Sequence, residues 1–293
     1  MQLPYRVAAE CPLILAPMAG VSEAPFRQVC RRFGADVLMT EFLAAEAIRR
    51  GIRQTLEGCE FARVERPIGI QIYGADPEAM AKAAAIVTAE YQPDFIDINF
   101  GCPVKKVVQR NGGSGCLRDL ELVDRIIRAV VAATHLPVTV KTRSGWSEQS
   151  RQPVEIALRM QEAGARAFTL HARTRTQMFS GEADWDEIAR VVEALDIPVI
   201  GNGDVQTADD VVAMRGHTGC AARLYAQVLC DNVGAAPPDT SLLEPRLAEH
   251  YEQAAIDFRG ITPEQVETAA VRYYAPMLCP AKSELILRLF MRS

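Results

Sequence analysis

Residues 95–103 read FIDINFGCP, a short apolar run that ends in Asn99, Gly101 and Cys102. The run at 95–100 has the length and the Ile/Phe content of a buried strand. Helical patterns flank it at 76–91 and 119–134, and the alternation of strand and helix recurs roughly every 30 residues, the size of a βα unit. The sequence therefore predicts a parallel sheet covered by helices.

Other segments extend this alternation along the chain. Candidate strands lie at 13–18, 37–42, 68–73, 137–142, 167–172 and 198–202, and further helices at 24–33, 153–164, 184–195 and 207–214. Repeated βα units close most simply into a (β/α)₈ TIM barrel, which we expect here. The eighth unit is atypical, because the apolar stretch at 224–229 makes a poor inner strand and leads into a Pro/Gly/Ala-rich linker.

The end of the chain has a different pattern. Helical segments follow one another there without strands, at 241–258, 263–275 and 281–292. We therefore expect a TIM-barrel domain over residues 1–236 and a small α-helical domain over residues 240–293.

The composition is that of an ordinary globular protein, with 49% of the 293 residues hydrophobic and 24% charged. No apolar stretch approaches the roughly 18 residues of a membrane span, and the start of the chain lacks the pattern of a signal peptide. We expect a cytoplasmic monomer. The eight cysteines are irregularly spaced, which predicts neither a disulfide framework nor a metal site. The net charge of −5 argues against nucleic acid binding unless basic residues cluster locally.

Polar and small residues gather where the candidate strands end. In a barrel these ends meet the βα loops and form the active-site face. Any one of these residues could have a structural role, and a free cysteine is most often simply a buried apolar residue. Their recurrence at the same place on successive strands favours a site. The positions are Pro17, Met18, Ala19, Gln71, Asn99, Cys102, Lys141, His171, Arg173, Asn202, Gly203 and Asp204.

The chemistry of these residue types fits a flavin. Lys141 can stabilise negative charge that develops on a bound ring. The amides of Gln71 and Asn99 both donate and accept, which suits the edges of a flavin or a pyrimidine. Residues 201–203, Gly-Asn-Gly, offer approachable N–H groups after the seventh strand, where barrels commonly bind phosphate. Because no G-x-G-x-x-G opens a Rossmann unit, a phosphate-bearing flavin fits better than a stably held dinucleotide.

With these motifs the chain resembles the tRNA-dihydrouridine synthases, and among them the bacterial B-type enzymes. The likeness rests on NFGCP at 99–103 and on further motifs in the same order and spacing. They are APMAGV at 16–21, GIQ at 69–71, KTRSGW at 141–146, HARTR at 171–175 followed by Gly181 and ADW at 183–185, and GNGD at 201–204.

The resemblance implies an FMN-containing barrel followed by a helical tRNA-binding domain, with NADPH as reductant. Specific uridines in tRNA would become 5,6-dihydrouridine by hydride transfer from FMN to C6 and proton transfer from Cys102 to C5. The resemblance also implies FMN contacts for Pro17, Met18, Ala19, Gln71, Lys141, His171, Asn202, Gly203 and Asp204. It implies substrate contacts for Asn99, Lys105, Arg110 and Arg173. Further candidates for docking on tRNA are Arg49, Arg50, Arg53, Lys106, Arg272, Lys282, Arg288 and Arg292.

One segment departs from the family pattern. The family has an eighth strand that ends in Gly-Arg, a pair suited to binding the FMN phosphate. Here residues 219–236 read GCAARLYAQVLCDNVGAA, with Arg223 as the only basic residue, and the family's usual Tyr after HARTR corresponds to Phe179. Either a local frameshift has altered this segment, or the chain binds FMN weakly.

Two other functions stay open beside the one that the resemblance implies. The first is an FMN barrel that acts on a free pyrimidine, as a dihydroorotate dehydrogenase does. The second is a tRNA-binding protein that has lost flavin and catalysis, which the departure at 219–236 alone supports.

Overall fold

The structure is a computed structural model in which residues 2–9, 12–32, 34–205 and 207–225 are described. Within them eight parallel strands form one sheet, in the order β1-β8-β7-β6-β5-β4-β3-β2. A parallel bridge between Ile14 and Val37 joins the two ends of this order, so the sheet closes into a barrel. The strands are β1 (Leu13–Leu15), β2 (Leu38–Ala44), β3 (Ile68–Tyr73), β4 (Phe95–Phe100), β5 (Val138–Arg143), β6 (Phe168–His171), β7 (Val199–Asn202) and β8 (Ala222–Tyr225).

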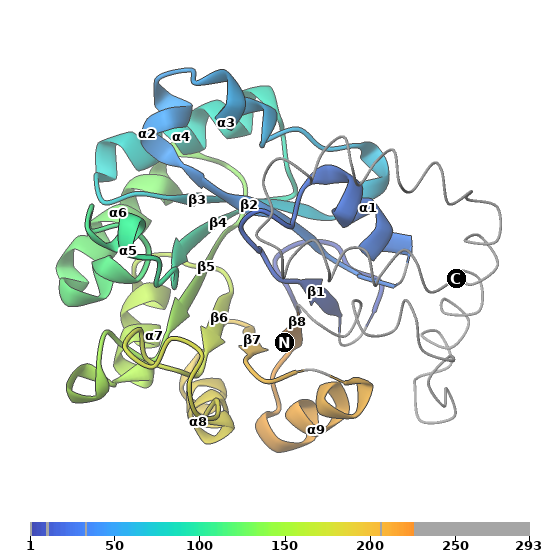
Figure 1. The fold of residues 1–293 in the computed structure, drawn as a ribbon, viewed down its shortest axis with the longest axis vertical. Helices are drawn as coiled ribbons and strands as arrows, with labels where there is room; N and C mark the ends of the chain where they lie inside the picture. The colour runs from blue at the N-terminus through green and yellow to red at the C-terminus, as the bar shows by residue number, and fades with distance from the viewer. Residues whose placement is uncertain (1, 10–11, 33, 206, 226–293) are drawn as a thin grey trace.

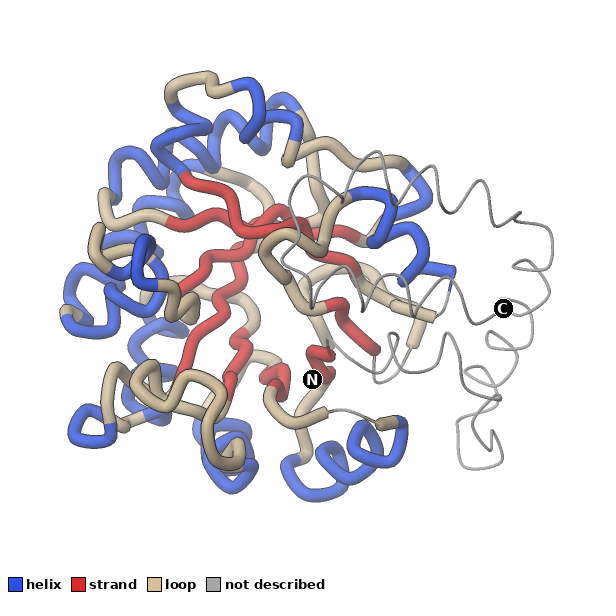
Figure 2. Tube along the Cα trace, viewed as in Figure 1, coloured by secondary structure: helices blue, strands red, loops and turns tan. Residues whose placement is uncertain are grey.

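Helices surround the strands on the outside of the barrel, as Figure 1 and the tube trace of Figure 2 show. The predicted TIM barrel is therefore confirmed. The helices are α1 (Ala24–Arg32), α2 (Ala45–Arg49), α3 (Arg53–Glu57), α4 (Pro77–Glu90), α5 (Lys105–Val108), α6 (Leu120–Ala133), α7 (Pro153–Glu162), α8 (Trp185–Ala194) and α9 (Ala208–Thr218), with short 3₁₀ turns η1 (Arg63–Glu65), η2 (Gly113–Arg118) and η3 (Glu148–Ser150). The short helices α2, α3 and α5 are not predicted by the sequence pattern.

Two predicted boundaries are wrong for identifiable reasons. β1 ends at Leu15 rather than at residue 18, because the Ser22 hydroxyl binds the carbonyl of Ala16 and the amide of Met18 and turns the chain there. Helix α9 continues four residues beyond the predicted end at 214 and stops at Thr218, before Gly219 in the left-handed conformation (φ 67°).

The eighth strand is better formed than the sequence indicates. β8 pairs in parallel with both β1 and β7. It begins at Ala222, two residues before the predicted stretch at 224–229. Ala222 and Leu224 point into the barrel core, whereas Arg223 between them is also buried and interrupts the apolar pattern. A charged residue in the middle of a four-residue strand explains why the sequence pattern misses it.

The barrel interior is closed at the amino ends of its strands. Tyr5, from the segment that precedes β1, stacks on Phe95 at the start of β4, with ring centroids 4.2 Å apart and an interplanar angle of 16°. Gly69 on the neighbouring strand β3 leaves room for the Phe95 ring, since a Cβ at this position would lie 2.2 Å from Cε2 of Phe95. The open end of the barrel is therefore the one where the strands finish.

Part of the prediction lies outside the described residues. This holds for residues 226–236 of the barrel domain, for the helical domain at 240–293 with its helices at 241–258, 263–275 and 281–292, and for Arg272, Lys282, Arg288 and Arg292. Among the helices that are described, none combines the length and the apolar character that a membrane span requires.

Candidate active site

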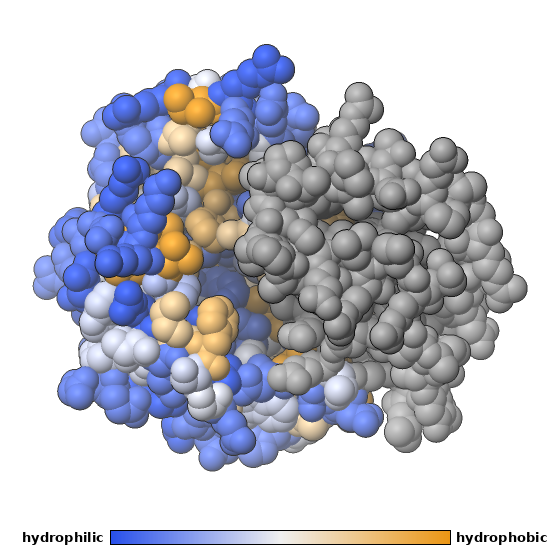
Figure 3. All heavy atoms as spheres, viewed as in Figure 1, coloured by the Kyte–Doolittle hydropathy of each residue, from blue (hydrophilic) through white to orange (hydrophobic). Residues whose placement is uncertain are grey.

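A cavity of about 550 Å³ lies at the carboxyl ends of the strands. In Figure 3 hydrophilic residues dominate the outer helices of this molecule, and apolar patches gather nearer the middle of the face. The cavity is lined from every side of the barrel, by residues of β2, β4, β5, β6, β7 and β8 and of the loops after β1, β4, β6 and β7. They are Ala16, Pro17, Met18, Ala19, Phe42, Asn99, Gly101, Cys102, Pro103, Val104, Lys141, Arg143, His171, Arg173, Phe179, Asn202, Gly203, Asp204, Val205 and Leu224.

Cys102 lies in the loop that follows β4, and hydrogen bonds fix this loop at several points. The side-chain oxygen of Asn99 accepts from the amides of Gly101 (3.0 Å) and Cys102 (2.8 Å). The carbonyl of Cys102 accepts from the amide (3.1 Å) and the hydroxyl (2.8 Å) of Ser114 in η2. The side chain is 7% exposed, so the thiol is held at the cavity wall rather than in solvent.

The surroundings of Cys102 favour its neutral form. Burial raises the pKa of the thiol, although the positive charges of Arg143 and Lys141 act in the opposite direction. A thiol with a raised pKa stays protonated at neutral pH and can therefore give up a proton.

Strand β5 brings two cations to the cavity. Burial and the charge of Arg143 together lower the pKa of Lys141 to about 8. Burial and the neighbouring Arg173 lower the pKa of Arg143 to about 10. Two cations held so close together at partly buried positions favour an anionic or electron-rich ligand.

His171, at the end of β6, is uncharged in this setting. Burial lowers its pKa to about 2, and the charges of Lys141, Arg143 and Arg173 add to the effect. A neutral imidazole can donate or accept a hydrogen bond without adding charge to the site.

Arg143 also ties two loops together. Its guanidinium donates to the carbonyl of Gly101 (2.9 Å) in the Cys102 loop, and to those of Thr174 (3.1 Å) and Met178 (2.7 Å) in the loop after β6. It lies 5.5 Å from the ring centre of Phe179, which is 72% exposed at the rim. The cation thus fixes the geometry of the cavity wall.

The end of β7 supplies a close backbone approach. Gly203 has φ 116°, and a Cβ there would lie 2.6 Å from that of Ala183, so this position requires glycine. The Asn202 amide donates to the Leu224 carbonyl at 3.1 Å, which ties β7 to β8. Asp204, which follows, accepts from the amide of Ala183 at 2.6 Å.

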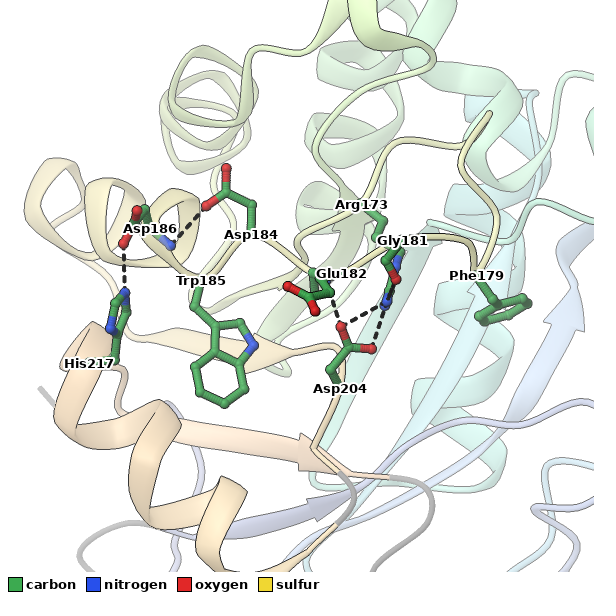
Figure 4. A pocket seen from close by; sticks show the side chains of 10 residues that line it. Arg173, Phe179, Gly181, Glu182, Asp184, Trp185, Asp186, Asp204 and His217 are labelled. Carbon is green, nitrogen blue, oxygen red and sulfur yellow. Dashed lines mark hydrogen bonds and ion pairs between the residues drawn. The ribbon is translucent and has the colours of Figure 1, made fainter.

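Arg173 and Asp204 form an ion pair at 2.8 Å, and they separate the cavity from a second one of about 910 Å³ (Figure 4). Acidic residues dominate the lining of this second cavity, and most of their carboxylates are engaged. Asp186 contacts His217 at 2.6 Å, and Asp184 caps α8. A negatively charged lining of this kind does not favour a phosphate.

The basic residues predicted to contact tRNA that are described outside the cavity fall into two groups. Lys105, at the start of α5, and Arg110 are exposed beside the Cys102 loop. The guanidiniums of Arg49 and Arg50 instead pair with Glu46, and that of Arg53 pairs with Glu57 at 2.8 Å. The first group, which holds Lys105 and Arg110, is the nearer of the two to Cys102 in the chain.

The structure brings most of the predicted site residues together. Pro17, Met18, Ala19, Asn99, Cys102, Lys141, His171, Arg173, Asn202, Gly203 and Asp204 line one cavity. Gln71 is fully buried below Asn99, to which it is hydrogen-bonded at 2.7 Å. The sequence reasoning missed Asp97 and Arg143, although each lies two residues from a predicted site residue on the same face of its strand. Strand periodicity could have found both.

No group of three or more His, Cys, Asp or Glu side chains in the described part of the chain is arranged to hold a metal ion.

Known proteins of one family are similar to this chain. The family model described as dihydrouridine synthase (Dus) matches residues 14–232. A probable tRNA-dihydrouridine synthase of Rhizobium leguminosarum bv. phaseoli is 37% identical over 89% of this chain and 82% of its own length. The tRNA-dihydrouridine synthase B of Xanthomonas campestris pv. campestris is 40% identical over 85% of this chain and 78% of its own. That of Xanthomonas axonopodis pv. citri is 40% identical over 75% and 65%.

Among solved structures, the BexX/CysO complex of Amycolatopsis orientalis contains a chain that matches with a TM-score of 0.50 at 17% identity. The match covers 90% of this chain and 98% of the other. At this level of identity it is a likeness of fold alone.

Proposed function

Since this chain belongs to the dihydrouridine synthase family, we propose that it reduces uridines of tRNA to 5,6-dihydrouridine, with FMN as its cofactor and NADPH as the reductant. The observation that carries the proposal is Cys102, a protonated thiol that shares one cavity with Lys141 and His171. We expect the protein to act as a cytoplasmic monomer.

The cavity suits FMN in size and charge. Its volume of about 550 Å³ lies within the roughly 300–1,000 Å³ usual for small-molecule sites. The cations Lys141 and Arg143 favour a ligand that carries negative charge. Among the described residues of the lining, Asp204 bears the one carboxylate, and it is already paired with Arg173. Gly203 lines the cavity without a side chain of its own, so a phosphate could approach the backbone after β7.

Each residue would contribute a different contact. Lys141 and His171 would bind the flavin ring, with Pro17, Met18 and Ala19 against it, and Asn202, Gly203 and Asp204 would lie near its phosphate. Gln71 would support the ring from below through Asn99. When bound, FMN supplies the hydride that is added at C6 of the uracil.

The protein itself supplies the proton for C5. Cys102 would give its Sγ proton to this carbon, and solvent would then reprotonate the thiolate. The raised pKa of the thiol keeps that proton available at neutral pH. Asn99 would face the uracil with the N–H that its bond to Gln71 leaves over, and Arg173 would contribute a further polar contact to the substrate.

The uridine has to leave the folded RNA to reach this cavity. Lys105 and Arg110 are exposed next to the Cys102 loop and would bind the phosphates that flank the extruded nucleotide. This local charge reconciles an acidic protein with an RNA substrate.

Replacement of Cys102 by alanine tests the proposal. We expect Cys102→Ala to keep bound FMN, seen by its absorbance, while turnover falls by about 10² to 10⁴, the usual contribution of a general acid. Turnover is measured as dihydrouridine formed with NADPH in tRNA from a strain that lacks the enzyme.

The matched control is Cys59→Ala, which removes another buried thiol far along the chain from the cavity lining and should keep full turnover. A purified protein that neither contains nor binds FMN would contradict the flavin part of the proposal. Activity on free orotate or uracil, without dihydrouridine in tRNA, would favour the free-pyrimidine alternative.

A further inference from the structure

A chain of buried hydrogen bonds runs from the centre of the barrel to the Cys102 loop. The Gln71 side chain donates to Asp97 at 2.6 Å. The Asn99 side chain donates to the Gln71 oxygen at 2.7 Å, and the Asn99 oxygen accepts from the amides of Gly101 and Cys102. Three hydrogen bonds in series therefore connect a carboxylate on β4 to the backbone of the residue that bears the thiol.

The direction of this chain is fixed at both ends. Backbone N–H groups can only donate, so the oxygen of Asn99 must face Gly101 and Cys102, and its amide nitrogen must face Gln71. A carboxylate can only accept, so the nitrogen of Gln71 must face Asp97 and its oxygen must face Asn99. Either amide turned by 180° would put two donors or two acceptors against each other. Asp97 therefore fixes the Gln71 amide from one end of the chain, and the backbone amides fix the Asn99 amide from the other, so that the two orientations agree.

A carboxylate at the position of Asp97 lowers the stability of the fold. It is 1% exposed, and its two oxygens are bound by neutral groups, the Gln71 amide and the Thr139 hydroxyl at 2.5 Å. Burial raises its pKa to about 6, against the effect of these hydrogen bonds and of the Lys141 charge. A buried carboxylate without a bound cation destabilises a fold, so an apolar side chain here would give a more stable barrel.

We propose that Asp97 is a positioning residue, which orients the amides of Gln71 and Asn99 and thereby holds the Cys102 loop in the geometry that presents the thiol to the cavity. Asp97 lies below the cavity lining and acts through the other two side chains. The predicted change in turnover rests on the proposed function. The predicted change in the position of the thiol does not, because that position can be measured without catalysis.

The test compares variants of Asp97 by the rate at which iodoacetamide alkylates Cys102, followed by mass spectrometry of the peptide that contains it. Asp97→Leu keeps the size of the side chain and removes the acceptor. We expect alkylation to become about tenfold faster, as for the loss of a buried hydrogen bond, and kcat to fall by about tenfold to a hundredfold as the thiol loses its position. The KM for tRNA should change little, since the phosphate contacts proposed for Lys105 and Arg110 lie outside the barrel and phosphate contacts supply much of the affinity for RNA.

Asp97→Asn is the conservative variant. Its side-chain oxygen can still accept from Gln71, and its nitrogen can donate to the Thr139 hydroxyl. We expect this variant to restore the wild-type alkylation rate and kcat to within about threefold.

Thr139→Val is the matched control, because it removes a hydrogen bond of similar burial from the other oxygen of the same carboxylate and leaves the chain intact. It should leave alkylation unchanged. If Asp97→Leu does not fold, Gln71→Met breaks the same chain at its middle and must give the same faster alkylation.

The proposal would be overturned if Cys102 in Asp97→Leu were alkylated at the wild-type rate. It would also be overturned if Thr139→Val accelerated alkylation as much as Asp97→Leu, because a general loosening of the core would then explain the effect. A wild-type protein that forms no dihydrouridine would instead contradict the proposed function, while the alkylation rates would still decide the role of Asp97.

Discussion

His171 illustrates how charge at the barrel mouth controls a single residue. Three cations, Lys141, Arg143 and Arg173, add to the effect of burial, and the pKa of the imidazole falls to about 2. In the unfolded chain the same side chain titrates near 6.5. Folding therefore favours neutral His171, and below pH 6.5 the unfolded state gains a proton that the folded state does not take up.

The first prediction follows from this difference in proton binding. As pH falls from 8 to 5, His171 should cost the wild-type protein about 2 kcal/mol of unfolding free energy, because 1.36 kcal/mol corresponds to each pH unit below about 6.5. His171→Gln should not show this loss. Urea unfolding of both proteins at pH 8 and pH 5 measures it.

The wild-type protein has to be compared with His171→Gln, because Asp97 changes the free energy of unfolding with pH in the opposite direction. Its folded pKa of about 6 lies above the usual value, so it adds stability as pH falls through about 6 towards 4. This contribution is the same in both proteins and cancels in the difference. Equal pH dependence of the two proteins would show that His171 is protonated in the fold.

At the residue scale, sequence alone predicted most of the residues that line the cavity, and it missed Arg143 in the cavity wall and Asp97 beneath it. Cys102 and Lys141 stand out because polar and small residues recur at the same place, the ends of successive apolar strands. Asp97 lies inside a largely apolar strand. Its role depends on hydrogen bonds with Gln71 and Thr139, which belong to other strands. Hydrogen bonds between distant segments do not show in a local pattern.

At the scale of elements, the contact of β3 with β4 depends on the absence of a side chain. Gly69 stands opposite Phe95 in the register of the two strands, and the aromatic ring occupies the space that a Cβ would need. The ring in turn stacks on Tyr5. One glycine thus allows the two strands and the N-terminal segment to pack together.

The second prediction compares two glycine replacements. Gly69→Ala should lower the free energy of unfolding by about 1–3 kcal/mol, because it overpacks a rigid core. Gly216→Ala places its Cβ in open space on α9 and should raise stability by about 0.5–1 kcal/mol, since alanine favours helix. Urea unfolding measures both, and a neutral Gly69→Ala would mean that the Phe95 ring can move aside.

The order and type of the main elements could be predicted because each βα unit repeats the same apolar pattern. β1 and β8 are the exceptions. β1 is shortened by the Ser22 hydroxyl, and the pattern of β8 is interrupted by Arg223. Both effects come from single side chains that act on the backbone or on the neighbouring strands, so no periodicity could have predicted them.

At the scale of the whole molecule, charge is unevenly placed. The chain carries a net charge of −5, and several surface arginines are paired with glutamate on their own helices. Lys105 and Arg110, in contrast, are exposed beside the Cys102 loop. Long-range attraction to RNA should therefore depend on a small region of the surface.

The third prediction tests that placement. Lys105→Gln and Arg110→Gln should each weaken tRNA binding and lower the slope of log affinity against log salt by about 1. Arg53→Gln removes the same charge from a residue paired with Glu57 and should leave the slope unchanged. Fluorescence anisotropy with labelled tRNA between about 50 and 200 mM salt measures the slopes, and equal losses in all three variants would contradict the prediction.

The stack of Tyr5 on Phe95 has a consequence for the order of events in catalysis. In the described part of the chain this stack and the buried side chains of Asp97 and Gln71 fill the barrel below the cavity. Under the proposed function, NADPH and the extruded uridine then have to approach from the same side. The two substrates would use one entrance in turn, which implies a ping-pong kinetic scheme in which the oxidised nucleotide departs before the RNA arrives.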